Sequence, residues 1–276
     1  AKYLPEFNHI KLDDGSDPSR PLTIRDCITH TSGLHGSQAV PGSLSDAVVA
    51  LADRSLAFQP GEQWKYSPGL NVAGRIIEIV SEKTFQDFLK ERIFEPLGMK
   101  NTTFYPSQRQ QARLAKMYQP NEDKTGLVEA TNTISNLDPK QGPSPSGGLV
   151  STARDMVRFY QAILSGGQLH GRRILSEELT SEMVTPKTGD LETGFTPGNC
   201  WGLGWCIVRE PQGVTEVLSP GTFGHGGAFG TQGWVDPETK TIYVLMVQRR
   251  NFGNSDGSEL RRVFQRAASS ALKLTD

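Results

Sequence analysis

The spacing of apolar residues predicts that the first two-thirds of the chain are mainly helical. In several segments apolar side chains recur every three or four residues, which places them on one face of an α-helix. The clearest segment begins at Thr152, which with Asp155 resembles a helix cap, and it ends at Gly166 and Gly167. Shorter helices are predicted from Thr23 to Ile28, from Ser45 to Leu56, around Val72 to Val80, from Thr84 to Phe94 and from Ser176 to Met183.

After Pro197 and Gly198 the pattern changes to short segments rich in β-branched and aromatic residues. Strands are predicted at 201–209, at 214–218 pairing back on the first, and at 241–248, and a final helix at about 258–274. Helices and strands that are segregated along the chain favour the α+β class over alternating α/β. We therefore expect one domain over residues 1–276, with a mainly helical subdomain at 20–195 and an antiparallel sheet with a C-terminal helix at 196–276.

Composition and charge exclude several kinds of partner. The 276 residues carry a formal net charge of −1, so no nucleic acid or other polyanion is implied. No apolar run is long enough to span a membrane, and the first residues are not a signal peptide. The three cysteines, Cys27, Cys200 and Cys206, fit no metal-ligand spacing and are predicted to be buried; a Cys200–Cys206 disulfide is the alternative. His30 and His35 near the first helix are predicted to be hydrogen-bonded scaffolding, so neither a metal nor a cofactor is expected.

A glycine-rich stretch, Gly221–Trp234, holds the most distinctive candidate chemistry. It contains six glycines and one ionisable residue, His225, and it precedes the predicted strand at 241–248. Glycine in a strand often marks a bulge or the close approach of a ligand or another backbone. We therefore predict that a substrate lies along this strand, where the N–H of Ala228 could bind an oxyanion. The alternative is a glycine-rich turn with a solvated histidine.

Four segments together suggest a family. They are LTIRDCITHTSGL at 22–34, Phe58-Gln59-Pro60-Gly61 followed by Tyr66-Ser67, SGGLVSTARDM at 146–156, and His225-Gly226-Gly227. In this order, over about residues 20 to 250, they resemble the motifs of the β-lactamase-related serine hydrolases, which include class C β-lactamases, D,D-peptidases and family VIII esterases. The resemblance implies a β-lactamase/transpeptidase-like fold in which helices flank an antiparallel sheet. Members are often exported, which favours an extracytoplasmic location.

The resemblance also implies roles for particular residues. The family transfers acyl groups from small esters or amides through the serine of a Ser-x-x-Lys motif. Tyr66 matches the tyrosine that acts as general base and then as acid, and His225 would orient the substrate or tune Tyr66. The N–H of Ala228, next to Gly226 and Gly227, would form half of the oxyanion hole. Candidates for the walls of the site are Phe223, Phe229, Trp64 and Trp201, although both tryptophans are equally suited to the core.

One departure from the family pattern concerns the substrate. The usual Tyr-x-Asn motif is here Tyr66-Ser67-Pro68, and proline offers no donor. The loss of the amide-recognising asparagine favours esters over β-lactams or peptides. Asn71, one helical turn later, is the alternative substitute.

A second departure concerns the nucleophile. The single Ser-x-x-Lys is Ser270–Lys273, in the predicted terminal helix, where we expect it at the surface. In the family this motif precedes the segment that resembles Tyr3–Phe7. We therefore expect the chain to begin after the nucleophile helix and the first strands, to be nearly inactive alone, and to have an open sheet edge that a second copy could cover.

Two other functional classes compete with a serine hydrolase. A non-catalytic relative that acts as a binding or scaffold protein is the alternative. An α/β-hydrolase is set aside, because no Gly-x-Ser-x-Gly elbow is present. The hydrolase hypothesis depends on one geometric expectation, that the Tyr66 ring faces the His225 imidazole.

Overall fold

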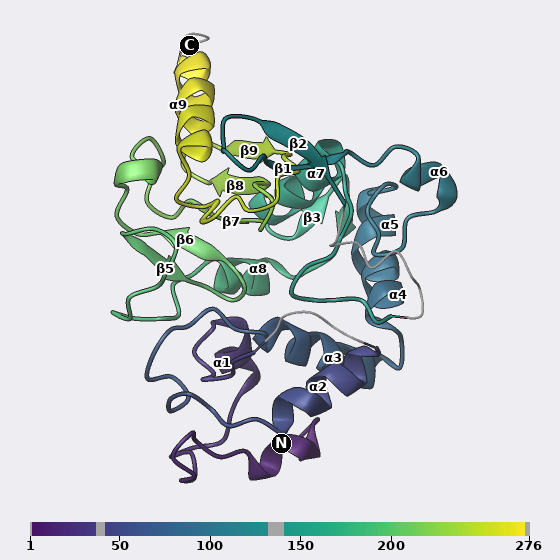
Figure 1. Cartoon of the computed structure of the whole chain (residues 1–276), viewed down its shortest axis with the longest axis vertical. Helices are drawn as coiled ribbons and strands as arrows, with labels where there is room; N and C mark the ends of the chain where they lie inside the picture. Colours follow the sequence, from purple (N-terminus) through teal and green to yellow (C-terminus); the bar gives the residue numbers. More distant parts are fainter. Residues whose placement is uncertain (1, 37–41, 132–140, 274–276) are drawn as a thin grey trace.

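The computed structural model describes residues 2–36, 42–131 and 141–273. In Figure 1 a lower group of helices near the N-terminus meets an upper part that contains the main sheet. The lower group comprises η1 (Pro5–His9), α1 (Ile24–Ile28), α2 (Leu44–Ala52) and α3 (Gly69–Ser81). Its core, called here the helical core, is mainly aliphatic and includes Leu44, Val48, Leu51, Leu56 and Val72.

Polar caps define the starts of α1 and α2: α1 begins after Thr23 as predicted, and α2, predicted from Ser45, begins one residue earlier at Leu44. Thr23 and Ser43 each accept a hydrogen bond from the backbone three residues later, and the acidic residue there returns one, which completes two capping boxes. The predicted end of this helix at Leu56 is wrong, because α2 stops at Ala52. Leu56 instead forms a parallel bridge with Leu12, and its side chain is fully buried. Long-range pairing thus overrides helical spacing at this point.

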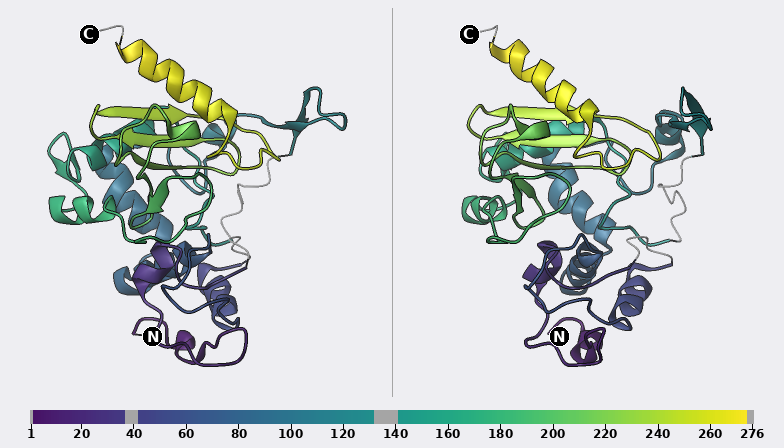
Figure 2. Two further views of the ribbon diagram at one scale, coloured as in Figure 1. Left: turned by 90° about the vertical axis from the view of Figure 1, so that its left-hand side faces the viewer. Right: turned by 60° about the vertical axis from the view of Figure 1, so that its left-hand side comes forward.

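The next segment bridges the two parts of the molecule. The predicted helix at 84–94 is divided into α4 (Phe85–Leu89), a π-helical turn η2 (Lys90–Phe94) and α5 (Glu95–Leu97), which ends at Gly98 in the left-handed conformation. A short helix α6 (Gln108–Gln111) and the hairpin of β1 (Met117–Pro120) and β2 (Leu127–Ala130) follow. Figure 2 shows this hairpin projecting from the body of the molecule.

The main sheet has five antiparallel strands in the order β5-β6-β7-β8-β9. Their bounds are β5 (Asn199–Trp201), β6 (Cys206–Val208), β7 (Phe223–Gly226), β8 (Gln232–Asp236) and β9 (Thr241–Leu245). The glycine-rich stretch forms β7 and the start of β8, which pair with each other, and β8 also pairs with β9, the strand predicted at 241–248. The single strand predicted at 201–209 is wrong in detail, because a turn at 202–205 divides it into parts of β5 and β6. The strand predicted at 214–218 is also wrong: η3 (Gly213–Thr215) is a 3₁₀ turn there, and β6 pairs with β7 instead.

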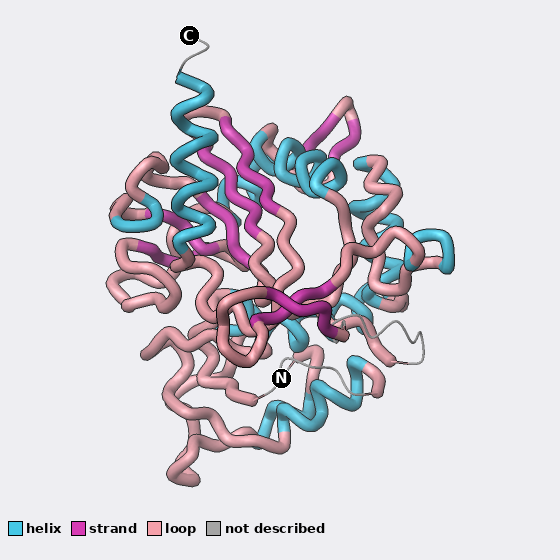
Figure 3. The backbone as a smooth tube through the Cα atoms, turned by 45° about the horizontal axis from the view of Figure 1, so that its top comes forward, coloured by secondary structure: helices cyan, strands magenta, loops and turns pink. Residues whose placement is uncertain are grey.

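Helices cover both faces of this sheet. On one face α7 (Ala153–Leu164) packs against β8 and β9, and the small hairpin of β3 (Gln168–Leu169) and β4 (Arg172–Arg173) and helix α8 (Glu177–Met183) lie nearby. On the other face α9 (Glu259–Lys273) runs alongside the strands, as Figure 3 shows. The core under α9, called here the sheet core, includes Trp201, Cys206, Val208, Trp234 and Tyr243.

All three cysteines are free and buried, as their spacing predicted. Cys200 pairs with Ile207 and Cys206 with Trp201 across β5 and β6. Cys200 packs on the α7 side and Cys206 in the sheet core, so the alternative disulfide does not form. No helix in the described parts of the chain combines the length and the apolar character that crossing a bilayer requires.

Candidate active site

The Tyr66 and His225 side chains meet where the lower helices approach the sheet. Tyr66 lies in the lead-in to α3, and His225 lies on β7. The Tyr66 hydroxyl is 3.3 Å from His225 Nε2, and the two ring centroids are 5.5 Å apart. The expected juxtaposition of phenol and imidazole is therefore confirmed, although the two residues are 159 positions apart in the chain.

Sequence reasoning missed a third member of this cluster, Asp256. Its Oδ2 lies 2.6 Å from His225 Nδ1, and the residue is 2% exposed in the loop that precedes α9. Burial raises the pKa of this carboxyl, but the hydrogen bond and charge of His225, together with Arg261, outweigh burial and hold the pKa below its ordinary value. The local sequence Asn254-Ser255-Asp256-Gly257 resembles an ordinary turn, so nothing near Asp256 indicated a partner in β7.

A buried guanidinium supports Asp256 from α9. Arg261 is fully buried, donates from Nη1 to the backbone oxygen of Asp256 at 2.8 Å, and places its Cζ 3.7 Å from the centre of the Trp234 ring. Burial lowers the pKa of Arg261 to about 10, against the raising effect of the Asp256 charge. Arg261 therefore remains charged at neutral pH and compensates the buried carboxylate.

His30 packs beneath the Tyr66 ring as a neutral scaffold. Their ring centroids are 4.4 Å apart, and the Ser67 backbone N–H donates to His30 Nδ1 at 3.1 Å. Burial, reinforced by the nearby His225, lowers the pKa of His30 to about 3. The scaffolding role predicted for His30 is confirmed by this hydrogen bond. His35 lies apart from the site, with Nε2 3.6 Å from Asp13 Oδ1.

Aromatic rings enclose the Tyr66–His225 pair. Phe195, which the sequence analysis did not single out, lies 5.1 Å from the Tyr66 ring and 5.2 Å from the imidazole. Its backbone has φ 77°, and Asn254 Nδ2 donates to its carbonyl oxygen at 2.5 Å. Trp201 and Trp64 complete the wall, and Trp201 is 5.3 Å from His225 while belonging to the sheet core.

The two phenylalanines predicted as walls of the site lie in different surroundings. Phe223 is 3% exposed and packs edge-to-face on Trp205 in the core on the α7 side, so its prediction as a wall of the site is wrong. The β7 backbone that brings His225 to the site places this apolar side chain in the interior instead. Phe229 lies in the β7–β8 turn with Ala228, which is exposed.

The glycines of the stretch make room for side chains of the protein itself. A Cβ at Gly226 would overlap Asp256 Oδ1 and Gln232 Nε2, and a Cβ at Gly233 would overlap the Tyr160 hydroxyl. Gly227 is similarly close to Thr231. The close approach that the glycines predicted is therefore confirmed at these positions, but the approaching groups belong to this chain.

Asn71 and Ser270 each have a defined place in the fold. Asn71 is buried, and its Oδ1 accepts a hydrogen bond from the Ser146 backbone N–H at 3.0 Å, which ties α3 to the segment before α7. The alternative that Asn71 recognises the substrate thus competes with a structural role. Ser270 lies exposed on α9, as predicted. Among the residues with described positions, no three His, Cys, Asp or Glu side chains are grouped as metal ligands.

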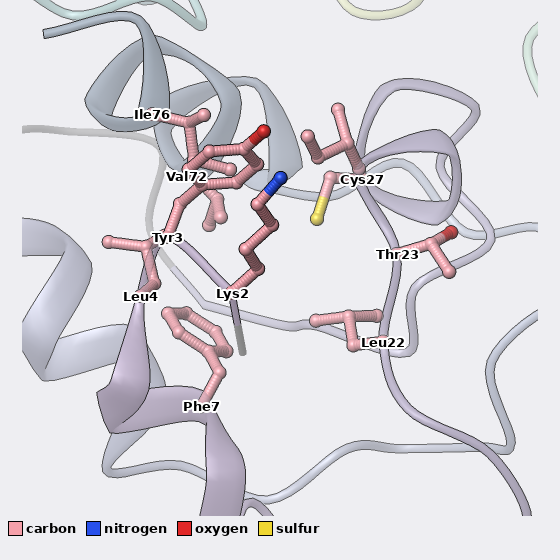
Figure 4. Close-up of a pocket in the computed structure, with 10 residues that line it drawn as sticks. Lys2, Tyr3, Leu4, Phe7, Leu22, Thr23, Cys27, Val72 and Ile76 are labelled. Atoms are coloured by element: carbon pink, nitrogen blue, oxygen red, sulfur yellow. The ribbon is translucent and has the colours of Figure 1, made fainter. Parts of the chain in front are cut away.

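A separate cavity of ≈ 190 Å³ lies beside η1, α1 and α3. Figure 4 shows the apolar side chains of Leu4, Phe7 and Val72 around it, and Lys2 and Cys27 also line it. Tyr66, His225 and Asp256 do not line this cavity. It is therefore distinct from the candidate site.

The β-lactamase family model matches residues 1–268. The Mycobacterium tuberculosis protein Rv1367c is 31% identical over 279 residues, an alignment that covers 90% of this chain and 69% of that protein. Lovastatin esterase from Penicillium rubens is 32% identical over 183 residues, which cover 60% of this chain and 45% of the esterase.

Solved structures agree in fold. EstCE1, described as a hydrolase with promiscuous acyltransferase activity, superposes with a TM-score of 0.78 at 22% identity, covering 97% of this chain and 76% of EstCE1. The β-lactamase/transpeptidase-like fold predicted from the motifs is thereby confirmed. This chain belongs to the β-lactamase family of serine hydrolases.

Proposed function

We propose that this protein hydrolyses small carboxylic esters through an acyl-enzyme, with Tyr66 as the group that moves the proton. The observation that carries the proposal is the 3.3 Å contact between the Tyr66 hydroxyl and His225 Nε2. A phenol beside an imidazole can pass a proton in either direction, as a general base and then as an acid. Family membership makes the serine acyl-enzyme the expected route.

The surrounding residues fit the other requirements of acyl transfer. The backbone N–H of Ala228, in the exposed turn that follows β7, would bind the oxyanion. Phe195 and Phe229 would contact the acyl or alcohol part of the substrate. Gly226 and Gly227 would serve mainly by letting the β7–β8 turn and the Asp256 loop approach each other.

Esters are favoured over amides for two reasons. Pro68 stands where the family motif has its amide-recognising asparagine, and Asn71 is engaged with the Ser146 backbone. An ester needs no such recognition, because it has no N–H to orient. The relative from Penicillium rubens carries the name lovastatin esterase, which supports the same substrate class.

We further propose that residues 1–276 do not turn over esters by themselves. The single Ser-x-x-Lys in the sequence begins at Ser270 on α9, and Ser270 is exposed on that helix. The acyl-accepting serine would then have to come from outside these residues.

Labelling with a fluorophosphonate probe tests both proposals. We expect residues 1–276 to remain unlabelled and an N-terminally extended protein to be labelled. Absence of labelling in both would favour a binding or scaffold protein, and labelling of residues 1–276 would refute the proposal about the serine.

In the protein that labels, Tyr66→Phe should lower kcat on a p-nitrophenyl ester by about 100-fold or more, as expected for loss of a general acid–base group. His225→Ala should also impair turnover, whereas the matched control His35→Ala, at a histidine outside the site, should not. Near-normal turnover of Tyr66→Phe would remove Tyr66 from the mechanism.

A further inference from the structure

We propose that Asp256 is a positioning residue, which fixes the His225 tautomer so that Nε2 presents its lone pair to the Tyr66 hydroxyl. The inference rests on the proposed function, since it explains how the Tyr66 phenol is made ready for proton transfer. None of the four motifs that identify the family includes residue 256.

The contact itself sets the tautomer. Asp256 Oδ2 lies 2.6 Å from His225 Nδ1, a distance typical of a charge-assisted hydrogen bond. An ionised carboxylate can only accept, so the proton of this bond must be on Nδ1. In the neutral imidazole, Nε2 is then the acceptor, and it faces the Tyr66 hydroxyl at 3.3 Å.

The Asp256 loop is anchored on three elements of the sheet region. Ser255 Oγ donates to the Gly227 carbonyl at 2.8 Å, next to β7, and Gln232 Nε2 on β8 donates to the Ser255 carbonyl at 3.0 Å. Arg261 on α9 donates to the Asp256 carbonyl at 2.8 Å. These bonds fix the carboxylate in place, because the loop cannot shift without breaking contacts to β7, β8 and α9 together.

The absence of a side chain at Gly226 makes this approach possible. A Cβ there would overlap Asp256 Oδ1 and Gln232 Nε2. The glycine that follows His225 therefore has a local purpose, which is to admit the carboxylate beside the strand. The Asp256 carboxylate can lie beside β7 only because residue 226 has no Cβ.

The arrangement defines a balanced proton step. The Tyr66 O–H bond breaks and an Nε2–H bond forms, which leaves a phenolate and an imidazolium and changes no other bond. The Asp256 carboxylate stabilises the imidazolium through Nδ1–H. The phenolate can then accept the proton of an attacking hydroxyl.

Other ionisable groups around the pair do not supply this stabilisation. Among the described residues, Asp256 and Tyr66 hydrogen-bond to the two ring nitrogens of His225, and the neutral His30 lies close enough to interact with it electrostatically. Arg261 and Cys206 face Asp256 from α9 and β6. Arg261 is cationic and would oppose an imidazolium, so Asp256 is the one anion in this set apart from the phenolate itself.

The test compares Asp256→Asn with Asp236→Asn. Asp236 is a matched control, since it is also a buried aspartate of the sheet region, but its carboxylate binds the backbone N–H groups of Ser219, Glu238 and Thr239. The tautomer of His225 is read from the ¹⁵N shifts of the imidazole in residues 1–276, a measurement that needs no turnover. Ester kinetics are measured in the extended protein.

We expect the Nδ1–H form in the wild type and in Asp236→Asn, and the Nε2–H form in Asp256→Asn, where the amide can donate to Nδ1. In the extended protein Asp256→Asn should lower kcat by about 10-fold or more with little change in KM. The same tautomer in wild type and Asp256→Asn would overturn the inference, as would a tautomer change without a change in kcat while Tyr66→Phe remains impaired. Full turnover of Tyr66→Phe would instead refute the proposed function and leave the tautomer result intact.

Discussion

The helical core and the sheet core differ in the kinds of side chain that they bury. The helical core is built from aliphatic side chains such as Val48 and Leu56, both fully buried, which contribute by leaving water. The sheet core buries aromatic rings, and beside them Asp256, Arg261 and Gln265 are also buried. Burying charge stabilises a fold less reliably than burying hydrocarbon of the same volume. The difference indicates that the polar groups by the sheet serve the site.

The contrast extends to the two histidines at the boundary, of which His30 is buried and His225 is partly exposed. His30 from the helical side is held neutral by burial, and its Nδ1 accepts a backbone N–H. His225 from the sheet side has a carboxylate on one ring nitrogen and a phenol on the other. One imidazole is therefore fixed as a packing element, and the other has partners on both nitrogens through which a proton can move.

The largest expected loss of stability follows from removing the buried guanidinium of Arg261. Arg261→Met should lower the free energy of unfolding by about 3–5 kcal/mol, because Asp256 keeps its charge without the buried cation. Urea denaturation measures this effect. Adding Asp256→Asn to Arg261→Met should recover part of the loss, and a cost below about 1 kcal/mol for Arg261→Met would contradict the role assigned to the cation.

The corresponding test in the helical core removes only hydrocarbon. Leu56→Ala should cost about 3 kcal/mol in the free energy of unfolding through the cavity it leaves. It should not change the ¹⁵N shifts of His225 in the folded protein. If those shifts did change, the two cores would be coupled and the comparison would fail.

A smaller effect concerns pH and His30. The pKa of His30 is about 3 in the folded protein against an ordinary value of 6.5, so between these values the unfolded chain binds a proton that the folded one does not. Stability should therefore fall as pH decreases, by about 2 kcal/mol from this group between pH 7 and pH 5. Asp256 does not contribute between pH 7 and pH 5, because a carboxyl with a lowered pKa loses its stabilising effect only at lower pH.

Denaturation at the two pH values measures this dependence, and His30→Leu should flatten it. The His30 ring resonances of the wild type give an independent check. They should not titrate between pH 5 and pH 8, and a titration in that range would show that the imidazole is not held neutral.

The smallest effect belongs to a local feature of the helical part. Thr23→Ala removes the cap of α1 and should cost about 1 kcal/mol. Thermal or chemical denaturation would detect this loss, and Thr29→Ala, at the other end of the same helix, provides a comparison. If Thr23→Ala lowered the free energy of unfolding as much as Arg261→Met, loss of the α1 cap alone could not account for the effect.

Local patterns predicted most of the helices, because caps and apolar spacing act within a few residues. Thr23, Ser43 and Thr152 each begin a helix by accepting a hydrogen bond from the backbone three residues later. The failures occur where distant pairing decides. Leu56 leaves its helix to pair with Leu12, and β6 pairs with β7 rather than with residues 214–218.

The site shows the same division. Tyr66 and His225 could be found because each lies in a motif, and the motifs imply a common site. Asp256 and Phe195 carry no local signal, since the first lies in a turn-like sequence and the second owes its position to φ 77° and a hydrogen bond from Asn254. Their roles follow only from the folded arrangement of segments far apart in the chain.

The aromatic wall gives the site an optical signal of its own. Trp201 lies 5.3 Å from the imidazole and 5.3 Å from Trp64, so these two of the four tryptophans in the chain share one environment. Trp64 also lies 6.0 Å from Phe195, so a ligand beside Phe195 would exclude water from Trp64. Intrinsic fluorescence should therefore follow the arrival of a ligand, without any added label.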